Sequence, residues 1–279
     1  MVAAYGGFVS LITVVSVVKD DAPGLRLTLD SFGPKPTPDS RILVLDGSAD
    51  RDVIPKLLAL YPFLETEYHW SPPTGVYGAM NDALNLVQSQ YVYFLNAGDT
   101  LASDRVPSKL QNSLAKSSPI WAIGRVLFFS ENGERLTEPP WSYERERKRL
   151  FARGVFPAHQ GVVAQTEALR QQGGFDLKFR ITADYVSILK LARESAPLEL
   201  DFPLASFHQG GLSTSEWRLS LREFHRARMT VFRPSGLAAM REVIDTVRLH
   251  IRTYAFHSLR RLRTRPSSPA AEYKPRLEQ

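Results

Sequence analysis

Apolar runs separated by polar breaks divide the first hundred residues into short segments. The run FVSLITVVSVV (8–18) is nearly continuous in apolar character and rich in β-branched residues, which is typical of a central parallel strand covered on both faces. Three further runs predict strands: RILVL (41–45), LETEYHW (64–70) and YVYFL (91–95). The segments between them have helical spacing: 22–32, 50–61 and 76–88. This alternation of strand and helix predicts a parallel α/β sheet.

The second half of the chain has a less regular pattern. IWAIGRVLFF (120–129) and LASFHQGGLST (204–214) predict strands, and TADYVSILKLARE (182–194) predicts a helix. FPAHQGVVAQ leads into a short helix that ends at Gly173-Gly174. From about Ser215 onward we expect two helices, the second running from Leu237 to about Leu262 with an apolar face and many arginines.

Composition bounds the class of protein. The chain has 279 residues, of which 43% are hydrophobic and 23% charged, as in a globular protein with a sizeable core. It has no cysteine, which excludes disulfides, thiolate zinc sites and a cysteine nucleophile. The apolar run 8–18 is shorter than the ~20 residues of a membrane span, and no basic residue precedes it. We therefore expect neither a span nor a secretory signal there.

Polar clusters follow three of the predicted strands directly. They are Lys19-Asp20-Asp21, Asp46-Gly47-Ser48 and Asn96-Ala97-Gly98-Asp99. Ligands of open α/β sheets bind at the carboxyl ends of the strands, so we expect these clusters along one edge. Asp99 is then either a ligand for Mg²⁺ or Mn²⁺, which prefer oxygen, or part of a plain turn. Asp46 either contacts a ribose or base, or belongs to a turn before a helix capped by Asp50.

Four further features have both a chemical and a structural interpretation. Gly75 precedes a helix whose N-terminus favours phosphate. Asn81 lies about one turn into this helix, where it could face the ligand. Tyr77, in the first turn, is equally compatible with a position in the core. Asp184 is either a capping acid near a helix start or a general base. His159 and His208 are either ordinary surface or core histidines, or neighbours of a metal.

These motifs occur in the order, and at about the spacing, of a known family. They are ITVVSVVKDDAPGLRLTLDS, ILVLDGSADRD, TGVYGAMNDAL, YVYFLNAGDTL, HQGVV, GGFDLKFRITADYVSILKL and FHQGGLST, which together cover roughly Ser10 to Ser215. The chain resembles the family 2 glycosyltransferases with the GT-A fold, especially the colanic-acid-type subgroup that acts in bacterial polysaccharide and glycolipid assembly. The last ~60 residues match nothing diagnostic.

The resemblance implies a role for individual residues. Asp184 matches the catalytic base of inverting members. Asp99 matches the last acid of the metal motif, and His208 lies, more loosely, where some GT-A enzymes have a further metal ligand. His159 and Gln160 match a pair lining the acceptor or donor pocket. The expected nucleotide and donor-binding residues are Asp20, Asp46, Gly75, Tyr77, Asn81 and Asn96.

The resemblance also implies fold and function. We expect a Rossmann-like GT-A domain over 1–214, with a mostly parallel sheet flanked by helices, a nucleotide-binding half at about 8–115 and an acceptor half at about 116–214. A basic helical extension (215–264) and a disordered tail (265–279) follow. The implied function is metal-assisted, hexosyltransferase-like transfer with inversion, using Mn²⁺ or Mg²⁺, a UDP-sugar as the favoured donor, and a glycan or lipid-linked acceptor.

Three positions depart from the family pattern. The first acid of the usual Asp-x-Asp triplet is replaced, because the segment reads Asn96-Ala97-Gly98-Asp99. Relatives often have Asp where this chain has Pro73, and another where it has Gly78. The losses at 73 and 78 bear on recognition of the donor base. They keep open an alternative function, a catalytically inactive sugar-nucleotide-binding partner of a polysaccharide assembly system.

Charge is concentrated toward the C-terminus. The net charge is +6, and the arginine excess lies in the last predicted helix and the tail. Such a helix either binds an anionic membrane surface or has an ordinary solvated basic face. We expect a cytoplasmic protein that, in the first case, is peripheral to the inner face of the membrane. The chain has no nucleic-acid-binding motif, and the segment SVVKDDAPG lacks the G-x-G-x-x-G loop of a dinucleotide-dependent oxidoreductase.

Overall fold

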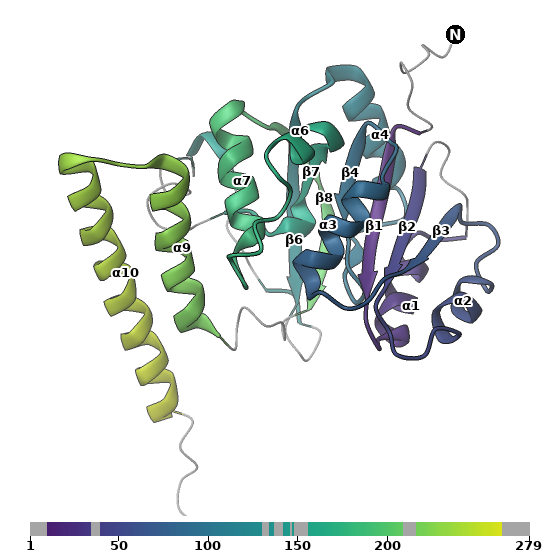
Figure 1. Cartoon of the computed structure of the whole chain (residues 1–279), viewed down its shortest axis with the longest axis horizontal. Helices are drawn as coiled ribbons and strands as arrows, with labels where there is room; N and C mark the ends of the chain where they lie inside the picture. Colours follow the sequence, from purple (N-terminus) through teal and green to yellow (C-terminus); the bar gives the residue numbers. More distant parts are fainter. Residues whose placement is uncertain are drawn as a thin grey trace, which may run out of the picture.

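A mixed β-sheet with helices on both faces organises the chain (Figure 1). The computed structural model describes residues 10–34, 40–129, 134–136, 142–145, 147, 156–208 and 216–263. Within these residues eight strands form one sheet in the order β3-β2-β1-β4-β7-β6-β8-β5. The strands are β1 (Ile12–Val18), β2 (Ser40–Asp46), β3 (Thr66–Trp70), β4 (Tyr91–Phe94), β5 (Thr100–Leu101), β6 (Trp121–Phe129), β7 (Val162–Gln165) and β8 (Leu198–His208).

The helices connect and cover these strands. They are α1 (Ala22–Asp30), α2 (Val53–Leu58), α3 (Val76–Leu86), α4 (Val106–Ser117), the 3₁₀ turn η1 (His159–Gly161), α6 (Thr166–Gln171), α7 (Ala183–Glu194), α9 (Trp217–Phe232) and α10 (Gly236–Arg263). The order of strands and helices in the first hundred residues is the one that the apolar pattern predicts.

Strands β1 to β4 are parallel to one another. β1 pairs with β2 and with β4, and β2 pairs with β3. β7 is antiparallel to both β4 and β6, whereas β6 and β8 are parallel. The predicted α/β fold with a mostly parallel sheet is confirmed. The sequence pattern did not identify β7 as a strand, and β8 begins at Leu198, earlier than predicted.

Two hydrophobic clusters cover the two faces of the sheet. Every residue of β1 is buried, and its side chains alternate between the clusters. Val15 and Val17 pack with α3, α6 and α7, whereas Val14 and Val18 pack with α1 and α2. Burying each such side chain contributes about 1.5–3 kcal/mol. Coverage on both faces explains why this strand is almost continuously apolar.

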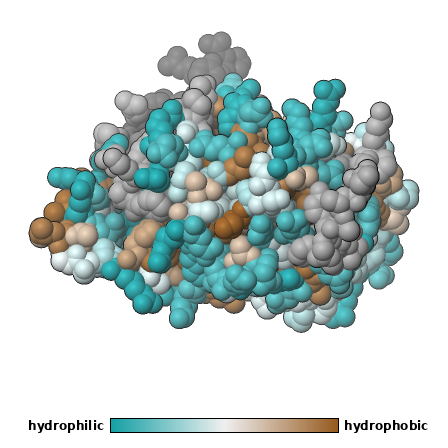
Figure 2. Space-filling model, turned by 90° about the horizontal axis from the view of Figure 1, so that it is seen from above, coloured by the Kyte–Doolittle hydropathy of each residue, from teal (hydrophilic) through white to brown (hydrophobic). Residues whose placement is uncertain are grey.

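The two helices expected after Ser215 are α9 and α10. Ala227 and Val231 of α9 join the cluster that contains α7, so α9 is continuous with the core of the α/β fold. α10 packs against α9, and hydrophobic side chains lie among polar ones at this end of the molecule (Figure 2). None of the described helices combines the length and apolar character needed to cross a bilayer. The predicted disordered tail (265–279) lies outside the described residues.

Candidate active site

A pocket of about 280 Å³ lies at the carboxyl ends of β1, β2 and β4. Its wall is formed by the ends of these strands, by the loop SPPTG and by the first turn of α3. The lining residues are Val17, Val18, Lys19, Asp21, Leu45, Asp46, Gly47, Ser71, Pro72, Pro73, Thr74, Gly75, Val76, Ala79, Asn96 and Ala97. The predicted site residues Asp46, Gly75 and Asn96 therefore share one pocket, at the edge where a parallel sheet binds ligands.

Asp46 and Asp20 join the ends of β1 and β2. Asp46 is fully buried, and its carboxylate accepts hydrogen bonds from the Ser48 amide (2.8 Å) and the Tyr68 hydroxyl (3.0 Å). Burial, and then the charge and hydrogen bonding of Asp46, raise the pKa of Tyr68 to about 12, so this hydroxyl remains a donor. Asp20 accepts from the Ala49 amide at 3.0 Å and has a positive φ of 53°. Asp46 lines the pocket, whereas Asp20 is exposed and, although predicted to bind donor, does not line it.

The loop SPPTG packs closely on its surroundings. Gly75 has a φ of 84°, a conformation that favours glycine, and precedes α3 without a side-chain cap. A Cβ at Gly78 would lie only 2.3 Å from Thr74 Oγ1, and a Cβ at Gly47 would lie 3.5 Å from Pro73 Cβ. Glycine at 78 therefore lets Thr74 fold over the first turn of α3. An aspartate there, as in the resembled family, would require this loop to move.

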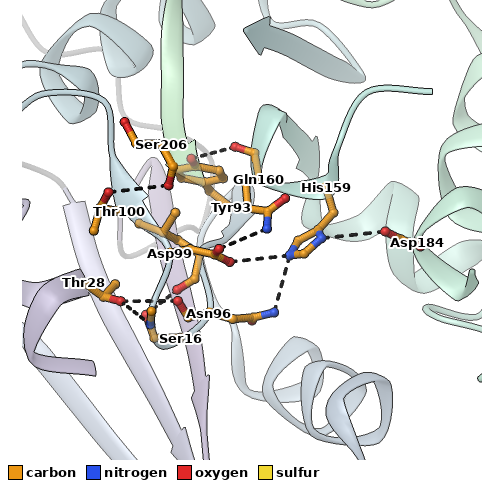
Figure 3. Close-up of polar contacts among 12 residues, drawn as sticks. Ser16, Thr28, Tyr93, Asn96, Asp99, Thr100, His159, Gln160, Asp184 and Ser206 are labelled. Atoms are coloured by element: carbon orange, nitrogen blue, oxygen red, sulfur yellow. Dashed lines mark hydrogen bonds and ion pairs between the residues drawn. The ribbon is translucent and has the colours of Figure 1, made fainter. Parts of the chain in front are cut away.

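The turn after β4 is held by buried hydroxyl groups. The Ser16 hydroxyl donates to the Leu95 carbonyl at 2.7 Å, and the Thr28 hydroxyl accepts from the Gly98 amide at 3.1 Å (Figure 3). Gly98 has a φ of 92°, which favours glycine. This geometry turns the chain so that the Asp99 carboxylate points toward η1.

His159 lies between the two carboxylates to which the sequence assigns chemistry (Figure 3). Its Nε2 is 3.9 Å from Asp99 Oδ2, and its Nδ1 is 3.7 Å from Asp184 Oδ2. Gln160 Nε2 donates to Asp99 Oδ1 at 3.0 Å, and the Gln160 carbonyl accepts from the Tyr93 hydroxyl at 2.8 Å. Residues 99, 159, 160 and 184, which are far apart in sequence, therefore form one cluster.

Burial and charge set the protonation of this cluster. Burial raises the pKa of the Asp99 carboxyl, an effect that the charge of His159 and the hydrogen bond from Gln160 only partly offset. Burial alone would lower the pKa of His159, but its interaction with the accepting Asp184 carboxylate and the charges of Asp99 and Asp184 raise it overall. An imidazolium at this position neutralises charge between two carboxylates that lie largely out of water.

Tyr77 and Asn81 position other parts of the site rather than lining the pocket. The Tyr77 hydroxyl shares its proton between the Ile181 carbonyl (2.7 Å) and Asp184 Oδ1 (2.9 Å). Burial and the Asp184 carboxylate raise the Tyr77 pKa far above its ordinary value, so this hydroxyl stays protonated. The Asn81 side chain donates to the Phe175 carbonyl and accepts from its amide, both at 2.8 Å. Asn81 thus fixes the chain before the segment that leads to Asp184.

The residues present fit a divalent cation that is held partly by protein oxygens and partly by oxygens of the substrate. In the part of the chain that the structure describes, no three His, Asp or Glu side chains gather into a metal site of their own. Asp99 is nevertheless buried beside Asn96, whose Oδ1 is buried without a hydrogen-bond partner among the described residues. Mg²⁺ commonly takes only one or two carboxylates together with water and phosphate oxygens, so this small oxygen set suits it.

His208 is placed only by its backbone. It is the last residue of β8 and pairs with Phe129, two positions beyond Ser206, which lies opposite Thr100. The His208 side chain lies outside the described residues. Its assignment as a metal ligand stays a prediction.

Sequence reasoning missed Glu223, which anchors the segment before Asp184. Its carboxylate, on α9, accepts hydrogen bonds from the amides of residues 180, 181 and 182 at 2.8, 2.9 and 3.0 Å, and from the Thr182 hydroxyl at 3.2 Å. Glu223 is 6% exposed. A signal was present in the sequence, because Glu223 falls at helical spacing between Ser220 and Ala227 on the buried face of α9.

No family model matches the chain. Proteins named uncharacterized glycosyltransferase, from two strains of Mycobacterium tuberculosis, are 26% identical over 211 residues, which is 73% of this chain and 77% of theirs. These relatives agree with the glycosyltransferase resemblance of the sequence.

Solved glycosyltransferase structures share the fold. TarS of S. aureus (residues 1–349) in complex with UDP-GlcNAc has a TM-score of 0.64 at 13% identity, over 88% of this chain and 73% of that one. The mannosyltransferase PcManGT of Pyrobaculum calidifontis, in complex with GDP-Man and Mn²⁺, has a TM-score of 0.58 at 14% identity, over 91% of this chain and 82% of that one. The fold is thus the GT-A-like fold of these neighbours.

Proposed function

We propose that this protein is an inverting, hexosyltransferase-like glycosyltransferase that moves a sugar from a nucleotide-diphosphate sugar to a hydroxyl of a glycan or lipid-linked acceptor. The observation that carries the proposal is the cluster of Asp99, His159 and Asp184, linked to the pocket at the carboxyl ends of the parallel strands by Asn96, whose Nδ2 lies 3.4 Å from His159 Nε2. The relatives named glycosyltransferase and the GT-A-like fold support it. Assignment to family 2 and its colanic-acid-type subgroup belongs to the same proposal.

In the proposed reaction Asp184 is the general base. Its carboxylate takes the proton of the acceptor hydroxyl, whose oxygen forms a bond to C1 of the donor sugar. The bond from C1 to the diphosphate oxygen breaks, and its electron pair leaves with the nucleoside diphosphate. Because attack and departure occur on opposite faces of C1, the anomeric configuration inverts. Tyr77 and the Tyr185 amide, at 2.9 and 2.8 Å from Asp184 Oδ1, orient the base through that oxygen, so the proton is taken by Oδ2, which lies 3.7 Å from His159 Nδ1.

The pocket is the proposed donor site. Lys19 and the N-terminus of α3 lie on its wall and favour the negative charge of a diphosphate. Asp99 and Asn96 Oδ1 would hold Mn²⁺ or Mg²⁺. A bound cation of this kind acts as a Lewis acid that stabilises charge on the leaving diphosphate. UDP is the nucleotide we favour; among the structural neighbours, TarS binds UDP-GlcNAc and PcManGT binds GDP-Man.

A catalytically inactive sugar-nucleotide binder is the second candidate. The specific observation in its favour is that Asp46, the buried carboxylate that lines the pocket, is already hydrogen-bonded to the Ser48 amide and the Tyr68 hydroxyl. Pro73 and Gly78 contribute no carboxylate in place of those common in the resembled family. This candidate predicts donor binding without transfer.

A thermal-shift screen of UDP-, GDP- and dTDP-sugars, with and without Mn²⁺, tests the donor site. We expect one nucleotide class to raise the melting temperature, and to do so more strongly with metal, because ligands that bind only the native state stabilise it. Turnover is then assayed as release of the nucleoside diphosphate. Metal-dependent binding without any turnover across acceptors would favour the inactive binder, and no shift from any donor would count against both candidates.

Asp99→Ala is expected to weaken donor affinity in the presence of Mn²⁺ about tenfold or more, equivalent to about 1.4 kcal/mol. The reason is that this carboxylate is the only acidic oxygen donor of the proposed cation site. Titration of the donor followed by calorimetry, with and without metal, measures the effect. Asp52→Ala is the matched control, because Asp52 is an exposed aspartate that does not line the pocket, and its carboxylate contacts Lys56 at 3.4 Å. Equal metal dependence in both variants would remove Asp99 from the cation site.

A further inference from the structure

An apolar stripe runs along the exposed side of α10. Its residues recur every three or four positions, so they lie on one helical face. They and their exposed fractions are Leu237 (80%), Met240 (56%), Val243 (47%), Ile244 (42%), Val247 (50%), Ile251 (64%) and Tyr254 (58%). Single exposed apolar side chains are common on proteins, but a contiguous stripe of this kind marks an interaction surface.

Arginines border the stripe on both sides. Arg241, Arg248 and Arg252 are exposed on α10 itself. On the other border Arg218 and Arg222 of α9, with Ile251 and Tyr254, line a groove of about 480 Å³ between the two helices. The Arg218 guanidinium lies 6.0 Å from the centroid of the Tyr254 ring. The surface is therefore apolar along its centre and cationic along both edges.

The carboxylates of these helices face away from the stripe or are paired. Between residues 217 and 255 the acidic residues are Glu223, Glu242 and Asp245. Glu223 is buried against the segment before α7, and Glu242 contacts Arg228 at 2.6 Å, in the α9–α10 interface. Asp245 lies 3.6 Å from Arg248. The partner that complements this surface is therefore apolar at its centre and anionic at its rim.

We propose that the stripe of α10 docks on a membrane that contains anionic lipids, with the apolar residues in the boundary between headgroups and acyl chains and the arginines among the lipid phosphates. An amphipathic helix with a basic polar face lies in the membrane interface in this way. A second copy of the chain fits less well, because two-fold pairing of the stripe would bring arginine rows together without carboxylates to pair them. Figure 2 shows the mixed hydrophobic and hydrophilic surface at this end of the molecule.

The orientation of α10 relates this surface to the candidate active site. In Figure 1 the carboxyl end of β1 and the carboxyl end of α10 point toward the same edge of the molecule. Resting on the proposed function, docking of α10 on a membrane favours a lipid-linked acceptor, whose hydroxyl would be presented to Asp184 from the membrane surface. The docking itself does not depend on catalysis.

Vesicle co-sedimentation of the full chain tests the docking. The probes are vesicles of phosphatidylcholine alone and vesicles in which phosphatidylglycerol replaces about a third of it. We expect binding to the anionic vesicles that weakens as salt is raised, and little binding to the neutral ones. Val247→Ser/Ile251→Ser and Arg241→Gln/Arg248→Gln/Arg252→Gln should each reduce the partition coefficient about tenfold.

Leu60→Ser is the matched control, because Leu60 is exposed to a similar extent (60%) but lies beyond α2. It should bind vesicles like the unaltered chain. Undiminished binding by the serine double variant would overturn the proposal and assign membrane binding to another segment. Absence of binding to anionic vesicles would also overturn it. So would a dimer, detected by light scattering, that forms only when Ile251 is intact and does not bind vesicles. The donor-induced thermal shift is measured in every variant as well. If the shift is preserved while vesicle binding is lost, the docking surface has failed and the proposed donor site has not.

Discussion

Asp184→Asn is expected to lower the rate of sugar transfer by about 10²- to 10⁴-fold while leaving donor affinity nearly unchanged. The amide cannot take a proton from an acceptor hydroxyl, but it has almost the same shape as the carboxylate. Its Oδ1 can still accept from the Tyr77 hydroxyl and the Tyr185 amide, which are 2.9 and 2.8 Å from Asp184 Oδ1. The start of α7 should therefore stay in place.

Two measurements check this expectation. Single-turnover release of nucleoside diphosphate reports the chemical step, and the donor-induced thermal shift reports binding. Tyr77→Phe is an informative companion, because it removes a hydroxyl that orients Asp184 but leaves the base itself. It should lower kcat less than Asp184→Asn does. Normal turnover by Asp184→Asn would show that the base is a different residue.

The sequence predicted correctly those strands and helices whose apolar pattern is compatible with only one kind of element. β1 is buried on both faces, so its almost continuous apolar run could only be a central strand of this kind of sheet. The clusters after β1, β2 and β4 were placed correctly at one edge because parallel strands end on the same side. Asp46, Gly75 and Asn96 accordingly line one pocket.

Other features depend on contacts between segments that are distant in the sequence, so they could not be predicted from the pattern of any one segment. β7 has four residues and is fixed by pairing with β4 and β6, not by its own length or pattern. Asn81, expected to bind donor, instead hydrogen-bonds to Phe175, which is 94 positions away. The pairing of His159 with both Asp99 and Asp184 likewise requires the folded sheet, because no spacing in the sequence encodes it.

The role of Glu223 shows that α9 belongs to the machinery that positions Asp184. Three successive backbone amides and one hydroxyl, all from residues 180–182 just before α7, donate to this one carboxylate. Because the segment before a helix sets the direction in which its first turn points, Glu223 acts on Asp184 through the backbone. A helix that sequence analysis assigned to an extension therefore supports the candidate active site.

Glu223→Ala is expected to destabilise the protein by about 3 kcal/mol, because it leaves buried amide donors without an acceptor. For a chain of this size the melting temperature should fall by roughly 6–10 °C. Glu216→Ala is the matched control, since Glu216 contacts the same segment through the exposed Arg180 side chain at 3.1 Å, and should change stability by less than about 1 kcal/mol. Calorimetric unfolding measures both variants.

Glu223→Gln separates positioning from stability. The glutamine oxygen keeps part of the acceptor set, so this variant should fold and bind donor with nearly unaltered affinity. However, its NH₂ group is a donor that faces the donor amides of residues 180–182, and this should displace them. Because a small misplacement of the base Asp184 slows the reaction, kcat should fall about tenfold or more. A loss of stability with unchanged kcat would confine Glu223 to a structural role, whereas a fall in kcat at constant donor affinity would show that α9 sets the position of the base.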